Sequence, residues 1–484
     1  MRATMNARRP VALALATSLL PLLHAQEPAP TPPPAAPTTI ASPFGDVRAL
    51  HAPPLETAEV RWTFWATFDE AGGSLGDFAA YLEDVQRRFT GDGVRVAVLM
   101  PEAAAREVTA RKPRFAVAML PTEPQEQSWP QFLIADAEGK PLLPTGLDGV
   151  VDVLAACTAG RGTETVQAAF DELDTLLANV GDAEVTAEMA AAIVEKLPHS
   201  GRARAIPVLE AWWCRGDHAA AKTAIDAGFQ ALGGETLPLC LFADLVLRGD
   251  HTDPSIARRV AVEMGPIAAA SGDSPFAQLV HLRALLRSGN DRLAGRLVAK
   301  LPKRVAGNAR LQQLLAETLM DGSTPATFRD LAEQQLAAVE AAGADGEATE
   351  MARHKILHRC GDVAGATALV TKRFPDTDAS SLNNLAWYAC VRIDTMGRFS
   401  PWALTISEEM LRREGERMTP NNKDTVALAH FCGGKVEEAF RLQTDAIRGH
   451  GEDRRYAGRL ARYEDALARQ KEAARTKPVT PPGK

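Results

Sequence analysis

Hydrophobic positions along the chain follow two patterns, and the change falls near residue 158. In the first part, short apolar runs typical of strands alternate with segments whose apolar residues recur at helical spacing. Strands are expected over 60–68, 94–100, 115–119 and 132–135, and helices over 77–89, 102–111 and 147–156. This alternation predicts an α/β domain, residues 44–157, in which helices cover both faces of a sheet.

The second part, residues 158–475, has helical spacing throughout and a recurring glycine. Successive glycines that close an apolar helical run lie 33 to 40 residues apart, at Gly181, Gly216, Gly249, Gly289, Gly322, Gly361, Gly397 and Gly434. Glycine just past a helix end adopts positive φ without a Cβ clash. The interval therefore predicts an all-α solenoid of stacked helical hairpins. The alternative is an irregular helical domain with chance glycines.

Two other residue types recur beside these glycines. An aspartate that can cap the next helix follows four of them: Asp182, Asp217, Asp250 and Asp362. An alanine small enough to let two helices cross closely lies five residues after four of them: Ala221, Ala294, Ala366 and Ala439. A charged final helix, 453–475, is expected to cap the stack against solvent.

The two ends of the chain differ in composition from the parts that are predicted to fold. Residues 1–25 combine three arginines with an apolar core too short to span a bilayer, which is typical of a secretory signal peptide. Residues 26–43 form a Pro-rich linker, and 476–484 a disordered tail. We therefore expect a periplasmic or secreted protein whose mature chain begins at Gln26. An uncleaved anchor is the alternative.

Net charge argues against one class of partner, and the cysteine content leaves the disulfide pairing open. The net charge is −7, and removal of the leader's three arginines lowers it to −10, which disfavours a nucleic-acid partner. No segment after the leader is apolar enough to cross a membrane. Six cysteines allow 15 disulfide pairings, among which the sequence does not choose. We interpret them as buried free thiols.

Residues 62–74 (WTFWATFDEAGGS) and 130–140 (PQFLIADAEGK) carry a family resemblance. They resemble the thioredoxin-like family, above all its periplasmic branch, in which a Phe-Trp-Ala-Thr-Trp strand end leads into Cys-x-x-Cys. Pro130 matches the proline that is cis in that family, and Asp136 with Gly139 matches its hairpin turn. The resemblance implies a thioredoxin-like fold over about 44–157.

The departure from that family concerns the reactive groups. Asp69 and Gly72 stand at the positions of the two cysteines, and neither can take part in thiol–disulfide exchange. The resemblance therefore implies the fold without the redox activity. It also implies a groove beside Pro130, with Trp65, Phe68 and Trp129 as candidate ligand contacts. The alternative for Trp65 and Phe68 is a packed strand end.

The last hairpins carry a second resemblance. Residues 381–387 (SLNNLAW) and 424–447 are similar to tetratricopeptide repeats, with Ala427, Gly434, Ala439 and Ala446 at the small positions. His430 replaces the usual tyrosine, and the earlier units are degenerate. The resemblance implies an array that binds proteins or peptides.

Two other clusters invite a functional interpretation. Glu350, His354 and His358 recur every four residues, with Cys360 beyond, and could begin a zinc site; a solvated helix face is the preferred interpretation. Trp212 and Trp213 are adjacent, so one is expected in the core and the other at the surface.

Together these patterns predict an exported protein-interaction scaffold, not an enzyme, with a redox-inactive thioredoxin-like domain and a peptide-binding helical array. No cofactor or metal is expected, and the partner is a protein or peptide rather than a nucleic acid. The alternative function is that of an envelope thiol–disulfide oxidoreductase or chaperone-like relative that retains some redox chemistry.

Overall fold

The computed structural model describes residues 38–42, 47–55, 59–68, 75–119, 132–144, 147–182, 184–249, 253–270, 274–343, 346–450 and 454–476. The chain divides into two units at Pro37, and the described residues all belong to the second, the compact unit Thr38–Lys484. The leader, residues 26–37 of the Pro-rich linker and the tail beyond Thr476 lie outside the described residues. In the described part, no helix is both long and apolar enough to span a bilayer.

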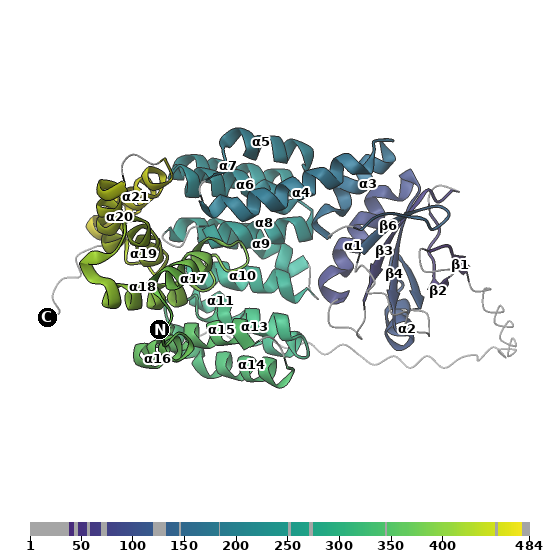
Figure 1. Ribbon diagram of the computed structural model, residues 1–484. Coiled ribbons are helices and arrows are strands. Elements are labelled where there is room, and N and C mark those ends of the chain that lie inside the picture. Colours follow the sequence, from purple (N-terminus) through teal and green to yellow (C-terminus); the bar gives the residue numbers. More distant parts are fainter. Residues whose placement is uncertain are drawn as a thin grey trace, which may run out of the picture. The chain divides into compact units, whose positions relative to one another are not determined.

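A seven-stranded mixed sheet occupies the N-terminal part of the second unit (Figure 1). Its spatial order is β1-β2-β5-β4-β3-β6-β7. The strands are β1 Thr38–Ile40, β2 Val47–His51, β3 Trp62–Thr67, β4 Val94–Met100, β5 Ala116–Met119, β6 Phe132–Asp136 and β7 Pro141–Pro144. Strands β3, β4 and β5 run parallel, while every other pairing is antiparallel.

Three helices accompany the sheet: α1 Leu75–Phe89, α2 Glu102–Ala110 and α3 Val150–Thr158. All three contribute buried residues to the same core cluster, which faces one side of the sheet. The crossovers β3-α1-β4 and β4-α2-β5 step in the same direction, and right-handed crossovers of that kind place both helices on one face. The expectation of helices on both faces is therefore wrong for the described residues, since the cluster on the opposite face is formed from strands.

The predicted linker extends too far into the fold. Thr38–Ile40 forms the edge strand β1, which pairs with β2, and the Ile40 side chain is buried. A β-branched run such as Thr-Thr-Ile suits a pleated, half-buried edge. The compact unit consequently begins at Thr38, ahead of the expected start at residue 44.

Helices make up the rest of the described chain. They are α4 Thr163–Asn179, α5 Ala187–Lys196, α6 Gly201–Leu209, α7 His218–Leu232, α8 Thr236–Gly249, α9 Pro254–Ala270, α10 Pro275–Arg287, α11 Asp291–Val298, α12 Leu301–Val305, α13 Ala309–Leu319, α14 Arg329–Ala341, α15 Gly346–Arg359, α16 Val363–Arg373, α17 Ala379–Val391, α18 Ser400–Glu414, α19 Pro420–Cys432, α20 Val436–His450 and α21 Arg454–Thr476. The 3-10 turn η3 Val180–Asp182 lies between α4 and α5, and the π-helical turn η4 Glu210–Cys214 lies between α6 and α7.

Each of the eight predicted glycines lies at the junction between two helices that pack against each other. Five of them adopt positive φ as predicted: Gly216, Gly289, Gly361, Gly397 and Gly434. All four predicted crossing alanines are buried, and Asp217 and Asp362 cap α7 and α16. The prediction is wrong for Asp182, because Thr186 caps α5, and Asp250 lies outside the described residues. The predicted helical array is therefore confirmed. The alternative, an irregular helical domain with chance glycines, is not supported.

Gly181 serves a different purpose from the one predicted. It lies in η3 outside the left-handed region, and a Cβ built there would come within 2.4 Å of the Val391 Cβ on α17. This glycine permits a close approach between two segments far apart in the sequence.

The last helix does not simply cap the array against solvent. Helix α21 packs against η4 near the start of the array as well as against α20 beside it. Its Arg459 and Arg462 side chains are buried, and the Arg462 guanidinium lies 4.0 Å from the Trp213 ring centroid. The end of the array therefore contacts its beginning.

Buried hydrogen bonds join the sheet region to the array. The Asp148 carboxylate, before α3, accepts hydrogen bonds from the Ser200 hydroxyl at 2.5 Å and from the Gly201 N–H at 2.9 Å. These groups lie at the start of α6, where free N–H groups need acceptors. Helix α1 also packs against α8 and α10.

Candidate functional site

Charged side chains recur on the inner helices of four consecutive hairpins, each pair four residues apart. Residues at this spacing lie on one face of a helix. The pairs are Asp244 and Arg248 on α8, Arg283 and Arg287 on α10, Glu317 and Asp321 at the end of α13, and Lys355 and Arg359 on α15. Together with Arg398, from the α17–α18 connection, we call these nine residues the interior charge network.

The network is held by ion pairs between neighbouring hairpins. Asp244 accepts hydrogen bonds from Arg248 on its own helix and from Arg283 on α10. Asp321 accepts from the Lys355 ammonium at 2.7 Å, and Glu317 accepts from Nε and Nη2 of Arg398, both at 2.8 Å. Removing any one partner would leave a buried charge uncompensated, which is costly.

Electrostatics within the network keep its carboxylates ionised. Burial by itself would raise the pKa of Asp321, but the positive charges of Lys355, Arg287 and Arg283 outweigh it and hold that pKa well below its usual range. Burial also opposes ionisation of Glu317, and Arg398 again reverses the effect and lowers the pKa. Both carboxylates therefore remain negative near neutral pH.

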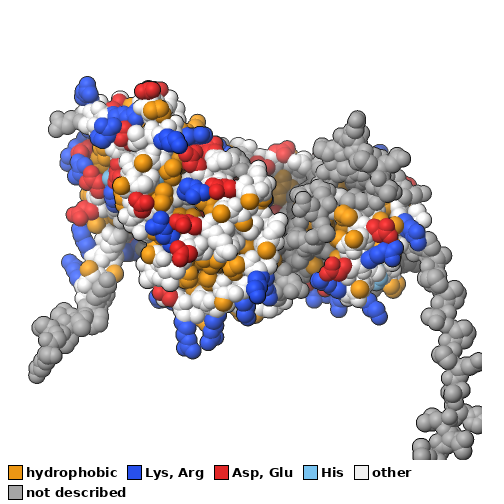
Figure 2. Space-filling model, turned by 90° about the horizontal axis from the view of Figure 1, so that it is seen from below, with side chains coloured by type: hydrophobic (Ala, Val, Ile, Leu, Met, Phe, Trp, Pro, Cys, Tyr) orange, Lys and Arg blue, Asp and Glu red, His pale blue; other side chains and the backbone are white. Residues whose placement is uncertain are grey.

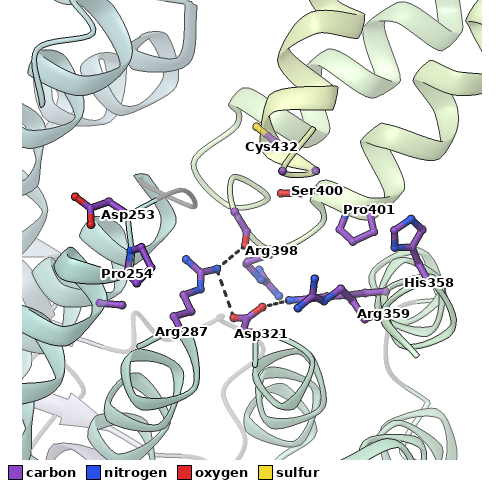
Figure 3. A pocket seen from close by; sticks show the side chains of 15 residues that line it. Asp253, Pro254, Arg287, Asp321, His358, Arg359, Arg398, Ser400, Pro401 and Cys432 are labelled. Atoms are coloured by element: carbon purple, nitrogen blue, oxygen red, sulfur yellow. Dashed lines mark hydrogen bonds and ion pairs between the residues drawn. The ribbon is translucent and has the colours of Figure 1, made fainter. Parts of the chain in front are cut away.

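A cavity of about 230 Å³ opens beside the network (Figure 3). Arg287, Asp321, Arg359 and Arg398 line it together with the first turn of α18. Other parts of the wall come from Lys355 and His358 on α15, the start of α9 and the Cys432–Gly434 turn. We call this the network cavity.

A second hollow, of about 350 Å³, lies between α15 and α17. Met351, Leu385, Phe399 and Trp402 give it an apolar wall, and Tyr388 stands at its edge with 52% of its surface exposed. Helix α15 packs against α18 at this point. We call this hollow the Tyr388 groove, which combines an apolar wall with an exposed aromatic residue.

Surface charge outside these hollows is mixed. Figure 2 shows Lys and Arg side chains interspersed with Asp and Glu over the described part of one face of the molecule. This face offers no basic stripe of the kind that follows a nucleic-acid backbone.

The predicted redox-motif positions fall largely outside the described residues. Asp69, Gly72, Trp129 and Pro130 all lie there. The matched hairpin turn is present, because Gly139 has a φ of 81° and Asp136 Oδ1 accepts a hydrogen bond from the Lys140 N–H at 2.7 Å.

Trp65 and Phe68 are core residues in the structure. Trp65 is 0% exposed and Phe68 is 5% exposed, and they contribute to the core clusters on opposite faces of the sheet. Their prediction as ligand contacts is therefore corrected to the alternative, a packed strand end, because neither side chain has surface to offer.

The predicted cluster around His354 does not converge. Glu350 lies 3.7 Å from Arg373, while His354 Nε2 lies 3.1 Å from the Thr405 hydroxyl, and the Cys360 thiol contacts Met320. The interpretation as a solvated face is wrong for His354, which is fully buried; burial and the neighbouring His358 lower its pKa to about 3. Among the described residues, no group of three His, Cys, Asp or Glu could hold a metal ion.

Both tryptophans of the adjacent pair are buried, contrary to the expectation that one would be exposed. Trp212 and Trp213 lie in the π-helical turn η4, and their rings meet edge to face with centroids 5.4 Å apart. The Arg462 guanidinium lies over both rings. No feature near Trp212 in the sequence indicates that α21 would cover them.

The interior charge network was not predicted from the sequence, although a signal for it exists. Arg248, Arg287, Asp321 and Arg359 each stand one or two residues before a hairpin glycine, at the end of an otherwise apolar run. A charge that repeats at one position of a helical repeat marks a shared buried surface.

Comparison with known proteins adds little to this description. No family model matches the chain. No curated protein matches it either. The crystal structure of the P58(IPK) TPR domain aligns over 63% of this chain and 99% of its own, with 14% identity and a TM-score of 0.17. A TM-score this low means that the two structures do not superpose as wholes.

Proposed function

We propose that this chain is an exported scaffold that binds a protein or peptide partner through its tetratricopeptide-like helical array. The observation that carries this proposal is the Tyr388 groove. It combines a buried apolar wall with an exposed aromatic side chain, and an exposed tyrosine over an apolar pocket is typical of an interface anchor. The occupant that fits is an extended peptide that places one apolar side chain against Leu385 and Tyr388, two of the lining residues that have exposed surface.

The N-terminal sheet, in this proposal, is a thioredoxin-like domain without redox activity. Support comes from the βαβ unit β3-α1-β4 followed by the β6–β7 hairpin at the matched turn. Cys157, the one cysteine that the sequence places in this domain, is buried, and burial raises the pKa of its thiol. A buried thiol with a raised pKa is a poor nucleophile at neutral pH.

Site-specific photo-crosslinking in the full chain tests the binding proposal. A photoreactive phenylalanine analogue at position 388 should crosslink one recurrent partner in extracts of the producing cell. The matched control is the same analogue at position 262 on α9, where Val262 is 62% exposed but lines no part of the groove.

Affinity for that partner supplies the second measurement. Tyr388→Ala should weaken binding by about tenfold or more, as for an interface anchor, while Tyr388→Phe keeps the ring and most of the affinity. The same adducts from positions 388 and 262, or an unchanged affinity for Tyr388→Ala, would show that the groove is not the docking site.

A further inference from the structure

The interior charge network carries more positive than negative charge. Three carboxylates, Asp244, Glu317 and Asp321, face six cationic side chains. The cations are Arg248, Arg283, Arg287, Lys355, Arg359 and Arg398. Asp253, the other acidic residue lining the cavity, is paired with Lys222 at 3.3 Å and with His218 at 2.6 Å. The network as a whole therefore carries an excess of three positive charges, and four of its cations line the cavity: Arg287, Lys355, Arg359 and Arg398.

Two guanidinium groups that line the network cavity are held mainly by neutral acceptors. Arg359 donates to the carbonyl oxygens of Met320 and Gly322, at 2.9 and 2.7 Å. Arg287 donates to the carbonyl oxygen of Gly397 at 3.1 Å and lies 3.5 Å from Asp321, which Lys355 already neutralises. Carbonyl groups orient these two cations without cancelling their charge.

The two guanidinium groups also repel each other. Burial lowers the pKa of Arg287, and the positive charges of Arg283 and, by less, Arg359 lower it further, against the opposing effects of Asp321 and Asp244. Like charges held this close in a partly desolvated space are destabilising unless a counter-charge lies between them.

A helix N-terminus faces the same space. Ser400 and Pro401, the first residues of the 15-residue helix α18, line the cavity, and no side chain caps this end of the helix. The positive end of the helix dipole attracts anions. Pro401 has no N–H, and the Trp402 and Ala403 N–H groups already donate to the Phe399 carbonyl oxygen, so the dipole and Ser400 are what this helix end offers. Arginines from α10 and α15 thus meet an uncapped helix end around one cavity.

We propose that the network cavity binds a phosphate group, either inorganic phosphate or the phosphate of a small monoester. A phosphate dianion offsets more of the excess charge than a single carboxylate does. Its tetrahedral oxygens can accept from guanidinium groups on two helices and from Ser400 at the start of α18 at once. About 230 Å³ has room for the anion and a small organic group. Phosphate binding here does not depend on the partner binding proposed at the Tyr388 groove, although Arg398 lines both hollows.

Isothermal titration calorimetry on the full chain tests the proposal. The probes are inorganic phosphate and glycerol 3-phosphate, each against sodium chloride at matched ionic strength. Saturable binding of at least one probe at millimolar or lower concentration is expected, and the ratio of the two affinities shows which source the site prefers. Arg359→Gln should weaken it by about tenfold or more, the loss expected for a hydrogen bond to a charged group.

Arg353→Gln is the matched control, since Arg353 is on the same helix but forms an exposed pair with Glu340. It should leave phosphate affinity unchanged. Ser400→Glu provides a variant that does not remove a network residue. Its carboxylate would occupy the cavity, so it should raise the melting temperature and abolish phosphate binding.

Three results would overturn the proposal. They are the absence of saturable heat with both probes, an equal loss of affinity in Arg353→Gln and Arg359→Gln, and unchanged phosphate binding in Ser400→Glu. The result with Ser400→Glu decides the question even if Arg359→Gln does not fold.

Discussion

Asp321 is the residue whose replacement tests the interior charge network most directly. Its side chain is 7% exposed and lies within ion-pair distance of Lys355, Arg283 and Arg287, at 2.7, 3.2 and 3.5 Å. Asp321→Asn preserves the shape of the side chain and one oxygen acceptor while removing the negative charge. Any loss of stability therefore reports the charge rather than the packing.

The expected cost follows from what the substitution leaves behind. Lys355 and Arg283 are 4% and 3% exposed, so neither can turn to water when its counter-charge is lost. Breaking a buried ion pair by removing one partner costs about 3–5 kcal/mol. Because asparagine can still accept one hydrogen bond, we expect a value near the lower end, about 3 kcal/mol.

Urea unfolding followed by circular dichroism measures this cost, provided that wild type and variant share the same slope. Glu340→Gln is the control, because it breaks the pair with Arg353, in which the two side chains are 44% and 42% exposed. An exposed pair contributes about 0–1 kcal/mol. A loss below about 1 kcal/mol in Asp321→Asn, or one no larger than in Glu340→Gln, would refute the view that buried charges stabilise the array.

Four other outcomes are expected. Because the Asp321 pKa is lowered by folding, its contribution should be complete above about pH 4 and be lost as the pH falls further; a difference in unfolding free energy between wild type and Asp321→Asn that does not shrink below that pH would contradict this. Gly361→Val should cost about 1–3 kcal/mol of unfolding free energy, because it forces a β-branched residue to a φ of 88°; an unchanged melting temperature would argue against the turn. Mass spectrometry of the mature protein should find an N-terminus near Gln26, and an intact Met1 would contradict export. The purified protein should not accelerate the reduction of insulin by dithiothreitol, and acceleration that disappears in Cys157→Ser would support the alternative redox function.

Local signals in the sequence were sufficient for elements whose structure depends on their own residues. The continuous apolar run VRVAVLM predicted β4, and it forms at Val94–Met100 because a central parallel strand is buried on both faces. Gly361 was predicted at positive φ because the end of α15 requires a residue without Cβ. In such cases the residue and its constraint are neighbours in the chain.

Features that depend on distant residues were not predicted. Arg462 belongs to a helix rich in charge, and only its contact with Trp212 and Trp213, far away in the sequence, explains its burial. Strand order likewise decides whether helices cover one face of the sheet or both, and the spacing of apolar residues does not specify strand order. The interior charge network was predictable in principle, but only by aligning the hairpins on their glycines and comparing equivalent positions.

The contact between α21 and η4 has a consequence for how such a chain can evolve. Open repeat proteins readily gain or lose units, because duplication of an internal unit preserves every neighbouring interface. Here, an added hairpin would separate Arg462 from Trp213 and Gly458 from the Cys214 carbonyl, which a Cβ at Gly458 would approach to 2.3 Å. Relatives of this protein should therefore vary in loop length and surface sequence while keeping the same number of hairpins.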